Sequence, residues 1–294
     1  MKNNIETIKC IICGNDNTET IKKGIDNQEF VNLVICKNCG LAYLNPRWNK
    51  QTYSDYYKSK YDEKYRSNAD SIKIPPINPI IERFKEHKNL FEKQLNVLDI
   101  GCGNGENLIA IKNKYSKACL FGIEPSLNAK KILAKNDIRF IATDADMDWE
   151  NAYNEYFDIV IMRHVLEHFL NPVAILQKVY KTLKKDGILY IAVPNNLNRN
   201  RLKGWARIPH TYYFNKYSLK NILNITGFDT VSIVEGDEFN KHEIFVIAYP
   251  SKEKIESILN FAYYIEQKEV FLHVLKKEKR IIYKLKKLLL KLTH

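Results

Sequence analysis

The chain has 294 residues, of which 45% are apolar and 27% are charged, a composition that predicts a soluble globular protein with one good-sized core and some appendages. It shows no signal-peptide pattern and no run of about 18 apolar residues, which excludes a membrane span and makes the cytoplasm the expected location. Half of the net charge of +12 lies in 251–294, where eleven Lys and Arg accompany five Glu, so a diffuse basic surface is favoured over a nucleic-acid site elsewhere.

Two Cys-x2-Cys pairs stand near the start of the chain, formed by Cys10 with Cys13 and by Cys36 with Cys39. A glycine follows each pair, and the segment between them has the pattern of a strand, a turn and a second strand. This spacing places four thiolates around one Zn²⁺ and predicts a zinc ribbon over 1–45. The metal would be structural, because so small a unit buries little core, and a metal-free or redox role is the alternative.

The next region, 46–79, is rich in tyrosine and ends in a proline-containing linker. Tyr53, Tyr57 and Tyr61 recur at helical spacing and predict a helix whose aromatic stripe packs on the main domain. The alternative is a lid that faces a hydroxylated ligand.

Helices and strands alternate through the third region, 80–250, as in a doubly wound α/β sheet. The expected helices are preceded by one at 80–93 and lie at 106–115, 127–135, 171–187 and 218–228. The expected strands lie at 97–100, 118–124, 138–142, 157–163, 188–195, 229–236 and 243–250.

The segment VLDIGCGNG at 97–105 is a buried strand followed by a glycine-rich turn. Gly101, Gly103 and Gly105 let the backbone turn sharply and approach a ligand without a clash from Cβ. Their spacing departs from the GxGxxG pattern of dinucleotide-binding folds, and an acidic residue, Asp99, precedes them. Glu124 ends the next strand, where its two oxygens suit the vicinal hydroxyls of a ribose.

These motifs, across about 95–250, resemble those of the class I S-adenosylmethionine-dependent methyltransferases, which have a Rossmann-like fold. The resemblance implies that the last two strands, 229–236 and 243–250, form the antiparallel edge of the sheet. The resemblance implies that Asp99 orients the amino group of the cofactor's methionine part and that Glu124 holds its ribose. It also implies that Asp144 accepts a hydrogen bond from the adenine amine, with Ala145 beside it. A zinc ribbon before such a domain is similar to the arrangement in bacterial methyltransferases that act on nucleotide-linked sugars.

The pattern HVLEH places His164, Glu167 and His168 after the fourth strand, with the spacing of one face of a helical turn. It resembles the ExxEH metal site of quinone-ring and small-RNA 2′-O-methyltransferases, in which a divalent ion binds the acceptor oxygens. His210 would correspond to a further histidine of the RNA enzymes. His164 replaces the first Glu, which weakens the match to Mg²⁺ because Mg²⁺ prefers oxygen ligands. The alternative is that Glu167 and His168 bond within the domain without an ion.

His210 is also a candidate general base, since a hydroxyl acceptor must lose its proton during methyl transfer. The residues around it suit a sugar face or a phosphate. These are Trp205, Arg207, Tyr212 and Tyr213, together with Arg199, Arg201 and Lys203. A loop that packs without touching any ligand is the alternative.

The last region, 251–294, contains RIIYKLKKLLLKL at 280–292, an amphipathic pattern with lysines opposite an apolar stripe. Such a helix packs on the domain or on a second subunit. Alternatively, it binds an acidic protein partner or the inner face of a membrane.

Together these features predict a methyltransferase that methylates a hydroxyl, or less readily a carbon or nitrogen, of a sugar-like or nucleotide-linked metabolite in surface-glycan biosynthesis. One alternative is an RNA methyltransferase that uses the ribbon and the basic surface. A second is a non-catalytic scaffold subunit that binds the cofactor, against which the complete set of acidic residues argues.

Overall fold

The computed structural model describes residues 4–26, 29–57, 74, 78–85, 87, 93–195, 208–251 and 260–292. Several residues singled out in the sequence therefore lie outside the described residues, namely Tyr61, Arg199, Arg201, Lys203, Trp205 and Arg207. The same holds for most of the proline-containing linker and for the second half of the helix expected at 80–93.

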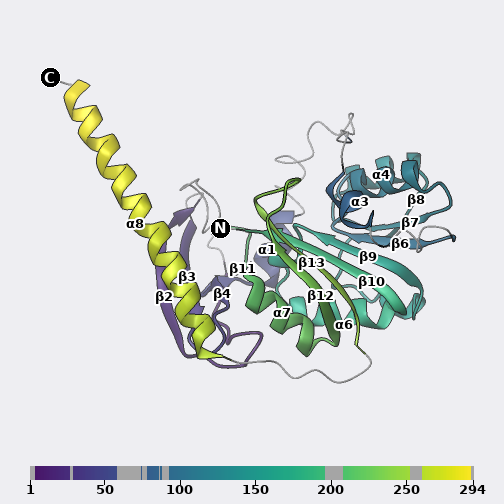
Figure 1. Ribbon diagram of the computed structural model, residues 1–294, viewed down its shortest axis with the longest axis horizontal. Coiled ribbons are helices and arrows are strands. Elements are labelled where there is room, and N and C mark those ends of the chain that lie inside the picture. Colours follow the sequence, from purple (N-terminus) through teal and green to yellow (C-terminus); the bar gives the residue numbers. More distant parts are fainter. Residues whose placement is uncertain are drawn as a thin grey trace.

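A seven-stranded sheet forms the centre of the molecule (Figure 1). Its strands are β6 (Asn96–Ile100), β7 (Cys119–Ile123), β8 (Ile138–Ala142), β9 (Phe157–Arg163), β10 (Leu183–Pro194), β12 (Phe228–Glu235) and β13 (Glu243–Pro250). The order is β12-β13-β10-β9-β6-β7-β8, with β13 antiparallel to both of its neighbours and the other pairs parallel. This is the expected doubly wound sheet with an antiparallel pair at one edge, the Rossmann-like arrangement of the class I methyltransferase fold.

Helices cover both faces of the sheet because its central strands are apolar on both sides. On one face Leu108 and Leu133 join the core, and on the other face Leu176 and Leu219 do so. The first face carries α3 (Pro79–Arg83), α4 (Glu106–Lys114) and α5 (Leu127–Lys135). The second carries α6 (Pro172–Thr182) and α7 (Lys216–Ile225).

The helix expected at 171–187 is shorter than its sequence pattern suggested. It ends at Thr182, and β10 begins at Leu183, which pairs with Phe157 before the register shifts and resumes at Ile188. Leu183 is buried and Lys184 binds Asp158 of β9, so contacts with the neighbouring strand override the local helical pattern.

A second, four-stranded sheet lies beside the first (Figure 1). The expected strand, turn and strand between the cysteine pairs form β2 (Thr18–Asp26) and β3 (Glu29–Cys36). β4 (Ala42–Leu44) continues this sheet, and β11 (Tyr212–Tyr213) completes it from the other end of the sequence. A separate two-stranded sheet joins β1 (Ile5–Glu6) to β5 (Arg47–Trp48), and α1 (Lys50–Tyr56) follows.

The C-terminal helix α8 (Phe261–Leu292) packs on the four-stranded sheet, called the small sheet from here on, rather than on the seven-stranded sheet. Phe271 and Val274 share an apolar cluster with Val31 and Leu33 of β3. Figure 1 shows the helix running along β2 and β3 and then extending past them. Within the described residues, no helix is long and apolar enough to cross a membrane.

Candidate functional site

The glycine turn joins β6 to α4, and each of its glycines has a positive φ, at +74° for Gly101, +60° for Gly103 and +84° for Gly105. An L side chain is strained in this region. A Cβ on Gly101 would also lie 2.7 Å from Cγ2 of Val165, and one on Gly105 would lie 2.6 Å from Cδ1 of Ile138. The turn therefore requires glycine at these two positions for its conformation and for its packing.

Two buried carboxylates flank this turn. Glu124 follows β7 and accepts hydrogen bonds from the amides of Gly103, at 3.0 Å, and Ser126, at 3.3 Å. Asp99 accepts one from Nδ2 of Asn107, at 3.4 Å. Burial raises the pKa of Asp99 to about 7, although the bond from Asn107 acts against this rise. A cation bound beside Asp99 would favour its ionised form.

Asp144 and Ala145, which are expected to lie beside the cofactor's adenine, are in the loop after β8. Ala145 is buried, and its carbonyl accepts from Nε1 of Trp149 at 3.0 Å. Asp144 is exposed, and its Oδ1 accepts from the amide of Asp146 at 2.9 Å. One oxygen of Asp144 thus closes a turn, and its expected contact with adenine stays a prediction.

The structure brings together Glu167, His168 and His210, the residues expected on the acceptor side, although more than forty residues separate His168 from His210 in the sequence. One potential ligand atom from each lies within 4.8 Å of the others. Glu167 and His168 come from the short helical turn η4 (Leu166–His168), and His210 directly precedes β11. The rings of His168 and His210 meet edge to face with centroids 4.7 Å apart. Glu167 and His210 are buried, whereas His168 is half-buried.

His164 lies outside this group, because the chain leaves β9 there with a φ of +54° and only 166–168 forms a helical turn. Its Nε2 lies 2.8 Å from Oε1 of Glu243, and its Nδ1 lies 3.9 Å from Oε1 of Glu167. Burial raises the pKa of Glu243, but the bond from His164 and the charge of Arg163 outweigh burial and lower the pKa to about 2.

Glu243 and the arginines that bind it form a cluster that no pattern in the sequence indicates. Arg163 bonds Oε1 of Glu243 through Nε at 2.9 Å, and Arg83 bonds Oε2 at 3.0 Å. Arg83 also donates to both carboxylate oxygens of Asp237, through Nε at 2.8 Å and through Nη2 at 2.9 Å. Glu243 is the first residue of an apolar strand, a position where a charged residue is usually exposed to solvent. Only the pairing of β13 with β10 shows that it is buried.

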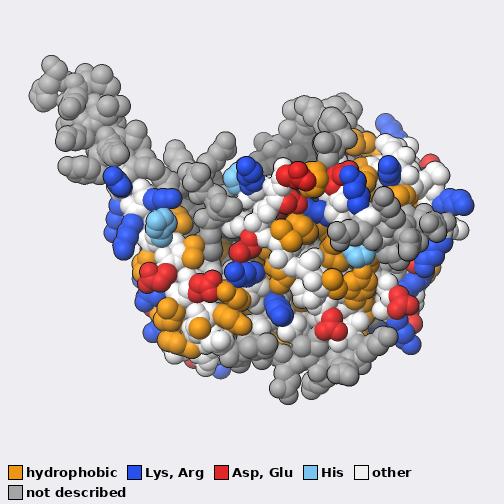
Figure 2. All heavy atoms as spheres, viewed as in Figure 1, with side chains coloured by type: hydrophobic (Ala, Val, Ile, Leu, Met, Phe, Trp, Pro, Cys, Tyr) orange, Lys and Arg blue, Asp and Glu red, His pale blue; other side chains and the backbone are white. Residues whose placement is uncertain are grey.

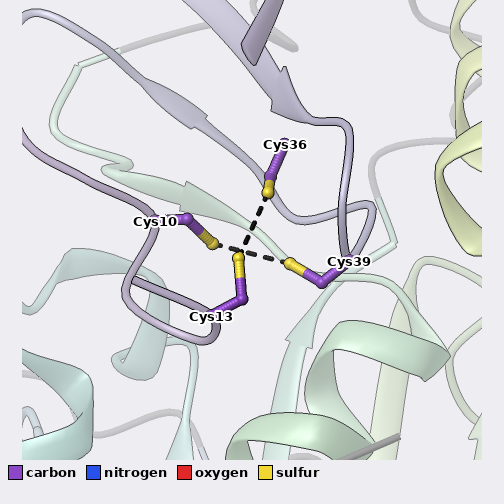
Figure 3. A group of neighbouring side chains, drawn as sticks. All are labelled: Cys10, Cys13, Cys36 and Cys39. Atoms are coloured by element: carbon purple, nitrogen blue, oxygen red, sulfur yellow. Dashed lines mark hydrogen bonds between the residues drawn. The ribbon is translucent and has the colours of Figure 1, made fainter. Parts of the chain in front are cut away.

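The four cysteines of the two pairs also converge (Figure 3). Their sulfurs lie within 4.8 Å of one another, with 3.5 Å between Cys10 and Cys39 and between Cys13 and Cys36. These distances are far longer than a disulfide bond and near the value of about 3.8 Å that tetrahedral Zn–S bonds of about 2.3 Å require. The glycines that follow the two pairs both have positive φ, as tight knuckles need. The arrangement fits a zinc ribbon.

Comparison with protein families matches residues 66–233 to a family described as a methyltransferase domain. The chain belongs to this family. It is an S-adenosylmethionine-dependent methyltransferase, so the glycine turn with Asp99 and Glu124 is the expected cofactor side of its active site.

Two curated relatives illustrate how far the methyltransferase similarity extends. The tRNA U34 carboxymethyltransferase of Sulfurimonas denitrificans is 27% identical over 234 residues, which cover 74% of this chain and 73% of that protein. The ubiquinone biosynthesis O-methyltransferase of Histophilus somni is 29% identical over 152 residues, which cover 48% of this chain and 60% of that protein. With several further relatives the match also spans only about half to three fifths of their length.

Among solved structures, a methyltransferase in complex with the Trm112 methyltransferase activator of Haloferax volcanii superposes with a TM-score of 0.48 at 12% identity. The superposition covers 68% of this chain and 97% of that one.

Proposed function

We propose that this methyltransferase transfers the methyl group to a hydroxyl oxygen of its acceptor, and that Glu167, His168 and His210 form a divalent-cation site that binds this oxygen. The observation that carries the proposal is the convergence of three ligand atoms from two distant segments within 4.8 Å. Glu167 and His168 lie in η4, which follows β9 and comes directly after Val165, whose side chain packs against the glycine turn of the cofactor side.

The donor set indicates which cations would suit this site. One carboxylate and two imidazoles are ligands typical of Mn²⁺, Fe²⁺ or Zn²⁺ sites, whereas Mg²⁺ favours oxygen alone. A bound cation would orient the acceptor hydroxyl and ease the loss of its proton. The protein holds these three ligands near the glycine turn of the cofactor side, and burial shields Glu167 and His210 from water.

His210 as a general base, without an ion, is the alternative for the same group. A buried imidazole beside the acceptor would accept the hydroxyl proton directly, and Glu167 would stabilise the resulting charge. His164 bonds Glu243, and its Nδ1 lies 3.9 Å from Oε1 of Glu167, so we propose for it an electrostatic role beside Glu167 in either version.

Labelled S-adenosylmethionine incubated with a cell extract, followed by mass spectrometry, identifies the acceptor and distinguishes these versions. We expect transfer to stop with EDTA and to return with Mn²⁺, and to be lost in Glu167→Gln and His210→Ala with cofactor affinity unchanged. His242→Ala, at an exposed position, is the matched control. Transfer that resists EDTA but is lost in His210→Ala would support the base. Transfer that survives in both variants would overturn the proposal, and any labelled product would exclude a non-catalytic scaffold.

The names of the two relatives favour a small metabolite or an RNA as acceptor, and neither name concerns a surface glycan. The expected nucleotide-linked sugar therefore stays a prediction without support from them. The RNA alternative is favoured by the longer of the two matches. Among the described residues on the face shown in Figure 2, however, Lys and Arg side chains are interspersed with Asp and Glu and form no single basic stripe. Salt-sensitive tRNA binding by the purified protein would favour RNA, and indifference to tRNA would favour a small metabolite.

We also propose that Cys10, Cys13, Cys36 and Cys39 hold one structural Zn²⁺. Four thiolates in two knuckles form a closed ligand set with no open position for a substrate. The ion would therefore support folding rather than take part in the reaction.

We propose that the end of α8, from 276 onward, binds an acidic partner, either a protein or the inner face of a membrane. Between 276 and 292 the sequence has eight Lys and Arg and one Glu. The first half of the helix is already packed on β2 and β3, which accounts for the structural role expected of the tail.

A further inference from the structure

Backbone hydrogen bonds of Thr211 connect the N-terminal region to the proposed acceptor site. The Thr211 amide donates to the carbonyl oxygen of Glu167 at 2.8 Å, and its carbonyl accepts from the amide of Leu44 at 2.9 Å. The residue next to His210 is thus bonded on one side to the turn that carries Glu167 and on the other side to the strand β4. The small sheet and the acceptor site share one hydrogen-bonded segment.

Side chains of β5 and α1 bind the same two segments. The hydroxyl of Tyr53 is 3.0 Å from the carbonyl oxygen of Pro209 and 2.5 Å from Oγ1 of Thr211, so it spans His210 from both sides. Arg47 donates through Nη1 to the carbonyl oxygen of Leu170 and to the hydroxyl of Tyr212, both at 2.8 Å. Tyr53 and Arg47 are buried. We call residues 42–57 the N-terminal clamp.

Tyr57, the last residue of the clamp, contacts a residue of the acceptor site directly. Its hydroxyl lies 3.3 Å from Nδ1 of His168, while Nε2 of His168 lies 3.8 Å from Oε1 of Glu167. The two ring nitrogens therefore face different partners. In a neutral imidazole, the nitrogen that donates its proton to an outer partner leaves the lone pair on the other nitrogen. A histidine that binds a metal commonly has its second nitrogen held in this way.

We propose that Tyr57 is a positioning residue, whose hydroxyl holds the ring of His168 at Nδ1 so that Nε2 faces Glu167 and His210. This inference rests on the proposed function of these three residues. It gives the N-terminal region a part in acceptor activation that its sequence pattern does not suggest. The N-terminal clamp would thus position Glu167, His168 and His210, none of which belongs to the clamp.

The test uses the full chain labelled with ¹⁵N-histidine. Long-range proton–nitrogen spectra report the tautomer of His168, assigned by its loss in His168→Gln, and titration with Mn²⁺ reports the affinity of the group. We expect Tyr57→Phe to shift the ¹⁵N signals of the His168 ring and to weaken Mn²⁺ binding by about 10- to 100-fold. Tyr56→Phe, which removes a hydroxyl from the preceding residue of α1, should change neither. Zinc content, melting temperature and cofactor affinity of Tyr57→Phe should match those of the unaltered protein.

The two readouts separate this inference from the function on which it rests. An unaltered protein that binds no Mn²⁺ would contradict the proposed cation site, whereas the ¹⁵N signals of His168 would still report on Tyr57. If the ¹⁵N signals of His168 and the Mn²⁺ affinity are both unchanged in Tyr57→Phe, Tyr57 has no positioning role.

Discussion

The expected donor side and the proposed acceptor side of this methyltransferase are assembled in different ways. The donor side comes from the ends of consecutive parallel strands, and Asp99, Gly103 and Glu124 lie within 26 residues, bonded to one another or to the next turn. The acceptor side joins η4 to His210 and is held by the N-terminal clamp, from a different sheet. Damage to the small sheet should therefore abolish the acceptor site and leave cofactor binding intact.

The largest effect should come from the cysteine cluster. Cys36→Ser removes a ligand of the proposed zinc site, whose binding free energy in small zinc domains is about 10 kcal/mol or more. We expect loss of zinc by mass spectrometry, loss of amide-exchange protection over 4–57, and loss of Mn²⁺ binding, with cofactor affinity retained. Cys119→Ser, outside the cluster, is the control. Intact protection and Mn²⁺ binding after zinc loss would show that the two sides do not depend on the small sheet in this way.

The converse change acts on the donor side alone. Glu124→Gln replaces a carboxylate that bonds the Gly103 amide and is expected to hold the ribose hydroxyls. Hydrogen bonds to a charged group contribute about 1.5–3 kcal/mol each, so the dissociation constant for S-adenosylmethionine should rise by about 10²-fold. Calorimetry measures this rise, with exposed Glu238→Gln as control. Unchanged affinity would remove Glu124 from the cofactor site, and a parallel loss of Mn²⁺ binding would contradict the independence of the two sides.

A smaller effect is expected from pH. Because the pKa of Asp99 is raised to about 7, the carboxylate that favours the cofactor's ammonium is mostly protonated at pH 6 and ionised at pH 8. Cofactor affinity should fall by roughly tenfold between pH 8 and pH 6, and this dependence should be absent in Asp99→Asn. The sign for stability is opposite. The folded protein holds this proton more tightly than the unfolded chain, so the contribution of Asp99 to the free energy of unfolding is present below about pH 4 and lost as pH rises through about 7. A pH-independent affinity in the unaltered protein would contradict the assignment of Asp99.

The smallest effect on either side should come from deletion of 276–294. The deletion leaves Phe271 and Val274 in place on β3, so the affinities for S-adenosylmethionine and Mn²⁺ should stay unchanged. Binding to vesicles that contain anionic lipid should be lost, since each basic residue near such a surface contributes about 1 kcal/mol. Vesicle binding that persists after the deletion would refute a membrane role for the tail.

The contrast between the two sides also explains how much the sequence could predict. The order of strands and helices in 96–250, the glycine turn and the cysteine knuckles follow from local patterns, because strand periodicity, positive φ and Cys-x2-Cys spacing act over a few residues. The end of α6 at Thr182 was missed because pairing of Leu183 with Phe157 overrides the helical pattern. The convergence of Glu167 and His168 with His210 was suggested by resemblance alone.

The sequence by itself indicated the methyl donor, because the glycine turn and the two acidic residues that flank it are close together in the chain and their arrangement depends on local backbone conformation. The acceptor site was decided by the tertiary structure. β11 pairs with β4 across about 170 residues, and this pairing brings His210 to Glu167 and Tyr57 to His168. No local pattern encodes such a contact, because its free energy comes from joining two sheets that the chain forms far apart.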